Sequence, residues 1–170
     1  MNNLKLLLIT LFLIFGQIIF ACDCESKDKF LKVSPKKELV TLVKIISYTN
    51  FENLYEEFEV PNNLTPMSME VEIIEIFKGK EDQKTITIWG DNGILCRPYI
   101  TEFKPNEYYL IALNKGLENS DFGQKNEKKS DYYISNCGEY WLKANVQKNF
   151  ATGYITNRKL PFSKIRKRLK

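Results

Sequence analysis

All four cysteines of this chain follow one apolar N-terminal segment, and this arrangement constrains the fold more than any other feature. The cysteines are Cys22, Cys24, Cys96 and Cys137. Residues 6–15 are apolar apart from Thr10, and the apolar stretch ends at Ala21. It is shorter than the roughly 20 residues that a membrane-spanning helix needs. The pattern predicts a secretory signal over residues 1–21 that is cleaved before Cys22, and therefore a secreted or otherwise extracytoplasmic protein.

At this predicted cleavage site, Cys22 has two competing interpretations. Residues 19–22 (IFAC) are similar to a bacterial lipobox, in which the cysteine sulfur carries a lipid. The alternative is a disulfide-bonded secreted protein whose free N-terminus lies on Cys22. An even number of cysteines in an oxidising compartment favours two disulfides, whereas lipidation would leave one thiol without a partner. We therefore expect contact with a membrane only if Cys22 is lipidated.

The spacing of the cysteines restricts how they can pair. A bond between Cys22 and Cys24 is disfavoured, because side chains two residues apart in an extended segment lie about 7 Å from each other. Each of the two should therefore bond to a distant cysteine, and both bonds together would hold residues 22–24 rigidly on the fold. The rival interpretation is a redox-active pair, for which a Cys-x-Cys motif with no following helix is weak evidence.

Composition excludes several classes of function. The sequence has no histidine, which excludes Ser-His-Asp and Cys-His catalysis and every metal site with a histidine ligand. Its 25 Lys and Arg against 21 Asp and Glu leave a net charge of +4, too small an excess to indicate nucleic acid as the main partner. No spacing of Asp and Glu singles out an acid–base pair. We expect neither enzymatic activity nor a cofactor of the protein's own.

Short apolar runs separated by turn residues indicate a mainly β fold. In the segment MSMEVEIIEIF, for example, Met69, Val71 and Ile73 would share one face while Glu70 and Glu72 share the other. Such strands predict a small barrel or sandwich. The expected strands are residues 38–48, 67–77, 84–89, 107–113 and 131–135.

Two segments have the pattern of short helices, residues 27–33 and residues 139–150. Between the strands, residues 115–130 are polar and contain two glycines, which predicts a loop.

The last part of the chain is basic. We divide the mature chain into a domain over residues 22–150 and a basic C-terminal extension over residues 151–170. Within the extension, residues 153–155 would add a strand. Residues 161–170 contain no acid and fit either a short amphipathic helix that touches anionic lipid or a partner, or a solvated, frayed end.

Several short motifs follow one another in order along the chain. Cys-Asp-Cys at 22–24 is followed by MEVEIIEIFKG at 69–79, Cys96, EYYLIA at 107–112, and a strand, cysteine and aromatic cluster at 134–142. This ordered set resembles the inhibitory domain of the tissue inhibitors of metalloproteinases (TIMPs) and the related netrin-like domains. The resemblance covers about residues 22–145.

The resemblance implies a fold and a disulfide pattern. The fold would be a five-stranded OB-like β-barrel with flanking short helices. The bonds would be Cys22–Cys96 and Cys24–Cys137, which would clamp the N-terminal segment beside the loop that precedes Cys96. The third disulfide of the family's inhibitory domain and the C-terminal domain of the animal proteins have no counterpart in this sequence.

The resemblance also implies inhibition of a zinc metalloprotease. In the family, the α-amino group and carbonyl oxygen of the first cysteine, here Cys22, chelate the protease's zinc and displace the water that attacks the substrate. The inhibitor needs no metal of its own and shares the zinc of its partner. Asp23 would enter the specificity pocket of the protease. The residues that the resemblance places in contact with the protease are Cys22, Asp23, Cys24, Glu25, Ile94, Leu95 and Cys96.

Asp23 departs from the family pattern, because the animal inhibitors carry a small hydroxyl residue there. Burying an unpaired carboxylate in an apolar pocket costs several kcal/mol or forces it to take up a proton. A protease with a basic pocket would fit Asp23 better than a common matrix metalloproteinase. The alternative function keeps the fold and drops the inhibition: a secreted or lipid-anchored netrin-like module for protein interaction, in which Cys22 and Cys24 are only structural.

Overall fold

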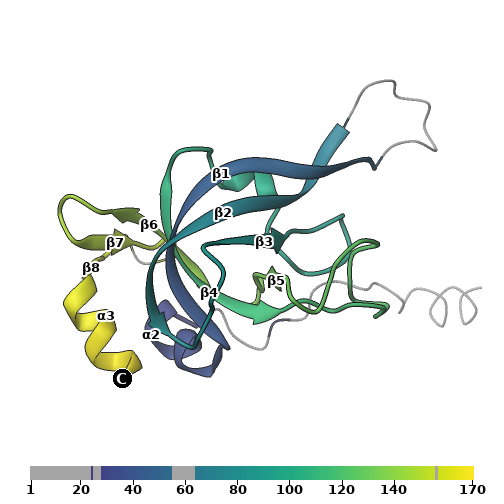
Figure 1. Ribbon diagram of the computed structural model, residues 1–170. Helices are drawn as coiled ribbons and strands as arrows, with labels where there is room; N and C mark the ends of the chain where they lie inside the picture. Colours follow the sequence, from purple (N-terminus) through teal and green to yellow (C-terminus); the bar gives the residue numbers. More distant parts are fainter. Residues whose placement is uncertain (1–23, 25–27, 55–63, 156) are drawn as a thin grey trace, which may run out of the picture.

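The computed structural model describes residues 24, 28–54, 64–155 and 157–170, and its architecture is a closed β-barrel with two short helices below it in the view of Figure 1. The strands are β1 (Leu39–Asn53), β2 (Leu64–Lys78), β3 (Thr85–Trp89), β4 (Tyr108–Lys115), β5 (Tyr132–Tyr133), β6 (Trp141–Asn145), β7 (Phe150–Thr152) and β8 (Lys159–Pro161). The helices are α2 (Phe30–Val33) and α3 (Phe162–Leu169), with 3₁₀ turns at Ser34–Lys36 and Ile100–Glu102.

Five strands close the barrel. The sheet runs in the order β1-β2-β3-β5-β4, and β4 pairs again with β1, from Leu39 opposite Leu113 to Lys44 opposite Tyr108. All of these pairings are antiparallel except that of β3 with β5, which is parallel. Closure gives each of the five strands a neighbour on both sides, although β5 pairs with only the last two residues of β4, Asn114 and Lys115. The predicted OB-like barrel of five strands with short helices is therefore confirmed.

The alternation of apolar and charged residues in β2 decides which side faces the interior. Met69 and Val71 are fully buried, whereas Glu70 and Glu72 lie on the other side and are half-buried. The long β1 strand shifts register against β2 at three places, one of them between Ile45 and Ser47. Such irregularities bend a strand, as a small closed barrel requires. All five predicted strands form, although β5 is shorter than residues 131–135 and β1 and β2 are longer than expected.

The core is built mainly of aliphatic side chains, with a cluster of three aromatic rings packed among them. The ring of Phe103, which is fully buried, lies 5.2 Å from the ring of Tyr109 and 5.5 Å from that of Trp141. Offset and edge-on contacts of this kind add to the stability that burial provides. Among the fully buried residues are Val40, Val43, Ile45, Met69, Val71, Ile88, Leu110, Ile111, Leu113 and Leu142.

The helix predicted over residues 139–150 is wrong, because this segment forms a β-hairpin of β6 and β7. One side of β4 offers free backbone groups, and β6 takes them up with Leu142 opposite Leu110 and Trp141 opposite Ile111. Asn149 has a φ of 53° in the turn between the two strands, a conformation that asparagine tolerates better than most residues. The strand expected over residues 153–155 is also absent from that segment, which forms a turn.

The prediction at residues 27–33 is confirmed in part. Helix α2 begins at Phe30 and passes into the 3₁₀ turn at Ser34–Lys36, while residues 25–27 lie outside the described part of the chain. Phe30 and Val33 face the core and are buried. The loop predicted over residues 115–130 contains turns but neither strand nor helix beyond the last residue of β4.

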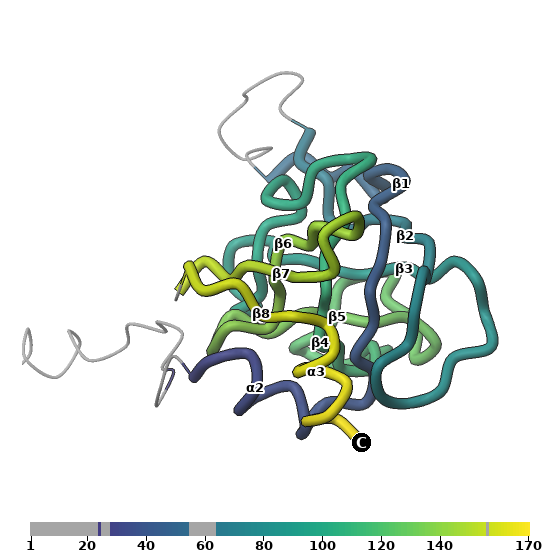
Figure 2. The backbone as a smooth tube through the Cα atoms, turned by 90° about the vertical axis from the view of Figure 1, so that its left-hand side faces the viewer, coloured from purple at the N-terminus to yellow at the C-terminus, as the bar shows by residue number. Residues whose placement is uncertain are grey.

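At the C-terminus, the amphipathic helix is the alternative that the structure contains. Phe162 and Ile165 of α3 are 2% and 0% exposed, and the ring of Phe162 meets the ring of Phe77 edge-on at 5.7 Å. Arg166 donates two hydrogen bonds to the carboxylate of Glu75, at 2.7 and 2.8 Å. Figure 2 shows α3 and α2 at the same end of the barrel. This end of the chain is therefore folded onto the barrel and is not frayed.

Candidate functional site

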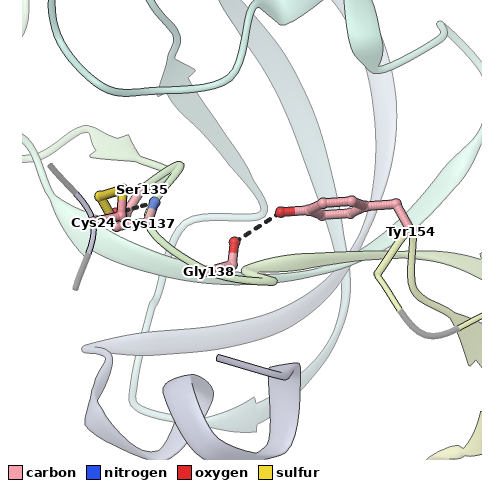
Figure 3. Close-up of a disulfide and its surroundings, with 5 residues drawn as sticks. All are labelled: Cys24, Ser135, Cys137, Gly138 and Tyr154. Carbon is pink, nitrogen blue, oxygen red and sulfur yellow. Dashed lines mark hydrogen bonds between the residues drawn. A yellow bond between two sulfur atoms is a disulfide. The ribbon is translucent and has the colours of Figure 1, made fainter. Parts of the chain in front are cut away.

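The predicted bond between Cys24 and Cys137 is confirmed (Figure 3). The two residues are 113 positions apart in sequence, and their Cα atoms lie 5.0 Å apart. Cys96 is also disulfide-bonded. Its expected partner Cys22 lies outside the described residues, as do Asp23 and Glu25.

A short turn brings the segments of Cys24 and Cys96 together. The backbone N–H of Asn136 donates to the carbonyl oxygen of Cys96 at 2.9 Å, and the next residue, Cys137, carries the disulfide to Cys24. The N–H of Cys137 in turn donates to the hydroxyl oxygen of Ser135 at 3.2 Å. Two residues that the family resemblance places at the protease contact, Cys24 and Cys96, are thus held by neighbouring residues of one turn.

The loop before Cys96 is shaped by short hydrogen bonds between side chains and backbone. One carboxylate oxygen of Asp91 accepts from the N–H groups of Gly93 and Leu95, at 3.0 and 2.8 Å. Such turns are a common use of aspartate, because its short side chain reaches the backbone two residues later. The loop leaves Ile94 79% exposed, which is a large exposed fraction for an aliphatic side chain. We call Cys24, Ile94, Leu95, Cys96 and Cys137 together the disulfide ridge.

A buried ion pair supports the base of this loop, and it was not predicted from the sequence. Arg97 and Glu127 are 2% and 3% exposed, and their side chains form a hydrogen-bonded pair at 2.8 Å. The guanidinium group also lies 4.2 Å from the ring centre of Tyr133, whose own pKa is raised, chiefly by burial. Glu127 accepts further bonds from two backbone N–H groups, those of Leu117 and Gln124. A buried pair with this many hydrogen bonds fixes the loop that holds it.

On the other side of the disulfide, buried Glu139 fixes the chain that follows Cys24. Its two carboxylate oxygens accept from the N–H groups of Phe30, at 3.2 Å, and Ile155, at 3.0 Å. Its own N–H donates to the carbonyl oxygen of Asp28 at 2.8 Å. A Cβ atom at Gly153 would overlap the Glu139 carboxylate, so glycine is required there for close packing. Sequence reasoning placed Glu139 in a helix and missed this role.

Tyr154 supports the same turn from the barrel side. Its hydroxyl donates to the carbonyl oxygen of Gly138 at 2.9 Å, as Figure 3 shows. Its ring is stacked on that of Trp141 with 4.8 Å between centres. Burial raises the pKa of Tyr154 to about 12, and the charges of Glu139 and Glu102 add to this effect. The phenol is therefore neutral at ordinary pH and able to donate.

The described residues contain no candidate metal centre. Among them, no group of three or more Cys, Asp or Glu side chains is placed to hold a metal ion. In the same part of the chain, no helix has the length and apolar character that crossing a bilayer requires. The disulfide ridge brings together residues far apart in sequence, of which Ile94 is exposed and the other four are half-buried.

Comparison with known proteins adds no family. The sequence matches no protein-family model, and no curated protein matches it. A function for this chain has to be argued from the barrel and the disulfide ridge.

Proposed function

We propose that this protein is a secreted inhibitor of zinc metalloendopeptidases that binds the zinc of its target through the α-amino group and carbonyl oxygen of Cys22. The observation that carries the proposal is the construction of the disulfide ridge. The disulfide of Cys24 ends at Cys137, and the hydrogen bond to the carbonyl oxygen of Cys96 comes from the N–H of the preceding residue, Asn136. Two of the residues that a TIMP-like inhibitor would present to a protease, Cys24 and Cys96, are therefore held at one turn, and this supports the proposal.

The chemistry needs only an unblocked N-terminus. An α-amino group has a pKa near 8, so it loses its proton at little cost when it meets a zinc ion. A catalytic zinc has three protein ligands and an open position occupied by water. The amine and carbonyl of Cys22 would displace that water and so remove the nucleophile. No peptide bond precedes Cys22 in the mature chain, which leaves the protease nothing to cleave at the metal.

The support around the ridge favours tight binding. Cys24 is fixed by its disulfide, and the chain from Asp28 onward is fixed by the bonds between Glu139 and the backbone of Asp28 and Phe30. A segment that is already ordered before binding loses less conformational entropy in the complex. Rigid attachment next to Cys22 would hold the chelating atoms in one position relative to the barrel.

The residues beside the chelating group suggest the kind of protease. Asp23 would place a carboxylate in the specificity pocket, which favours a pocket containing Lys or Arg. Exposed Ile94 would supply an apolar contact next to it. The combination predicts a target with a basic pocket and an adjoining apolar surface.

The test compares the exported protein with a variant that carries one extra alanine before Cys22. Intact mass first establishes that the mature chain begins at Cys22, with no lipid and with two disulfides. Against a panel of zinc metalloendopeptidases, we expect the extension to weaken inhibition by about 100-fold or more, about 2.7 kcal/mol, because a blocked amine is a poor ligand. An extended variant that inhibits as well as the unextended protein would rule out chelation.

Two controls separate inhibition from simple attachment. An extra alanine at the C-terminus should leave inhibition unchanged. If the N-terminal extension leaves binding to a partner intact and no inhibition is found, the netrin-like interaction module replaces the inhibitor as the function. Replacing Asp23 with threonine should strengthen inhibition of proteases whose pockets are apolar.

A further inference from the structure

A basic groove lies between the chain around α2 and the β8–α3 segment, close to the disulfide ridge. It has a volume of about 230 Å³. Four cations and two leucines line it: Lys29, Leu31, Arg158, Lys159, Leu160 and Lys164. We propose that this groove binds an acidic polypeptide segment of a partner protein.

The charge of the groove is largely uncompensated. Among the described residues, Lys29, Arg158, Lys159 and Lys164 form no ion pair. Buried Glu139 lies at the groove as well, but its two oxygens already accept hydrogen bonds from the backbone. One carboxylate facing four cations leaves a net positive surface, and such a surface attracts acidic partners and repels basic ones.

The flanking sequence extends this positive field. Residues 157–170 contain no Asp or Glu. Of the basic residues in this stretch, Arg166 is engaged in an ion pair with Glu75. The basic residues are Arg158, Lys159, Lys164, Arg166, Lys167, Arg168 and Lys170. An extended acidic segment could therefore follow the groove along α3 and meet further cations.

The shape and lining of the groove favour a peptide over a lipid surface. Helix α3 has buried Phe162 and Ile165 against the barrel, and half-buried Leu169 packs against the same core, so its apolar side is already used and does not favour insertion into a bilayer. The groove is concave, whereas a membrane surface is broad and flat. Half-buried Leu31 and Leu160 can contact the methylene groups of glutamate or a neighbouring apolar side chain while the cations meet its carboxylates.

The groove begins next to the disulfide ridge. Glu139 follows Cys137 by two residues, and Lys29 follows Cys24 by five. A partner held at the ridge could therefore also reach the groove. Binding in the groove does not require Cys22, so this proposal holds whether or not the protein inhibits a protease.

The test is fluorescence anisotropy with the exported protein and a fluorescein-labelled peptide of alternating glutamate and leucine. The groove variant combines Arg158→Glu with Lys164→Glu. A matched control combines Lys80→Glu with Lys84→Glu, which changes the net charge equally at lysines whose side chains are 84% and 81% exposed on the loop before β3. We expect the groove variant to bind about tenfold more weakly and the control less than about twofold more weakly.

A second probe and a milder groove variant complete the test. A probe with glutamine in place of glutamate should bind at least about tenfold more weakly than the acidic probe. Arg158→Gln with Lys164→Gln is a milder groove variant, which serves if the charge reversal disturbs folding as judged by circular dichroism.

Three outcomes would overturn the proposal. If the groove and control variants lose affinity for the acidic peptide equally, the binding is due to diffuse surface charge and not to the groove. Equal binding of the glutamine probe would exclude recognition of carboxylates. Groove-dependent binding to phosphatidylserine vesicles with no binding of the acidic peptide would assign the groove to a membrane surface instead.

Discussion

The two ends of the described chain are attached to the same barrel by different means. Near the N-terminus, Cys24 is bonded covalently to Cys137, and the chain that follows is fixed by backbone hydrogen bonds to Glu139. At the C-terminus, α3 is held by the buried side chains of Phe162 and Ile165. The N-terminal attachment adds a cross-link to the burial of Phe30 and Val33, whereas the C-terminal attachment relies on apolar burial and one surface ion pair.

This difference determines which surface each segment leaves free. A disulfide stabilises chiefly by restricting the unfolded chain, so it needs little buried apolar area. The short segment at Cys24 can therefore keep its outer side available for a partner. Helix α3 uses its apolar side to stay attached, and what it presents outward is charge. We infer that the surface at Cys24 suits a partner of complementary shape, whereas the outer surface of α3 suits a partner of opposite charge.

The cross-link is the larger of the two contributions. Replacing both Cys24 and Cys137 with serine should lower the free energy of unfolding by about 4–5 kcal/mol, because the bond closes a loop of more than 100 residues. Urea denaturation of the exported protein measures this loss. Hydrogen exchange should accelerate at residues 28–33 and 136–140 while α3 stays protected. Faster exchange throughout α3 under native conditions would show that the two attachments depend on each other.

Removing the packing at the other end should have a smaller effect. Phe162→Ala deletes a fully buried ring that meets Phe77, and we expect a loss of about 3 kcal/mol. The pattern of hydrogen exchange should be the reverse of that in the cysteine variant. Phe122→Ala is the matched control, because that ring is 72% exposed and its removal should cost less than about 0.5 kcal/mol. Similar losses in both variants would contradict the assignment of α3 to the core.

The barrel was predictable because its strands alternate or run apolar over whole segments. In β2 the alternation at residues 69–72 alone determines the buried side. The hairpin of β6 and β7 was not predictable in this way, because it depends on the open side of β4, a partner about 30 residues earlier in the chain. Local pattern at residues 139–150 indicated a helix, and tertiary pairing overrode it.

The candidate site, like the fold, could be predicted from the sequence only in part. The Cys24–Cys137 bond followed from a family resemblance carried by ordered motifs, and the structure contains it. The supporting residues Arg97, Glu127 and Glu139 were missed, because charged residues normally indicate exposed surface. The signal available in sequence was position: Arg97 follows one cysteine directly, and Glu139 lies two residues after another.

Tyr154 offers a finer test, since it touches the covalent end without forming part of the cross-link. Tyr154→Phe removes the hydrogen bond to Gly138 and keeps the ring stacked on Trp141. We expect a loss of about 1 kcal/mol in urea denaturation. The loss should persist when Phe162 is also replaced, because the ring of Phe162 packs on Phe77 whereas that of Tyr154 packs on Trp141. If the loss in the double variant differs strongly from the sum of the two single losses, the two ends of the chain are energetically coupled.

The pH dependence of stability reports on the same hydroxyl. The pKa of Tyr154 is raised from 10.0 to about 12 in the folded protein, so folding favours the neutral phenol. Its contribution is complete below pH 10 and is lost as the pH rises through about 12. Unfolding measured between pH 9 and pH 12 should therefore show a shallower alkaline decline in Tyr154→Phe than in the unchanged protein. Identical declines would place the titrating group elsewhere.

The smallest expected effect concerns the ion pair that accompanies the packing of α3. The side chains of Arg166 and Glu75 are 42% and 36% exposed, and exposed pairs contribute only about 0.2–1 kcal/mol. Glu75→Gln should therefore cost about 0.5 kcal/mol at low salt, and this cost should vanish near 1 M salt because the charges are screened. The loss in Phe162→Ala should persist at that salt concentration, since apolar burial is not screened. If Glu75→Gln costs as much as Phe162→Ala, α3 is held by charge, and the contrast between a cross-linked end and a packed end has to be redrawn.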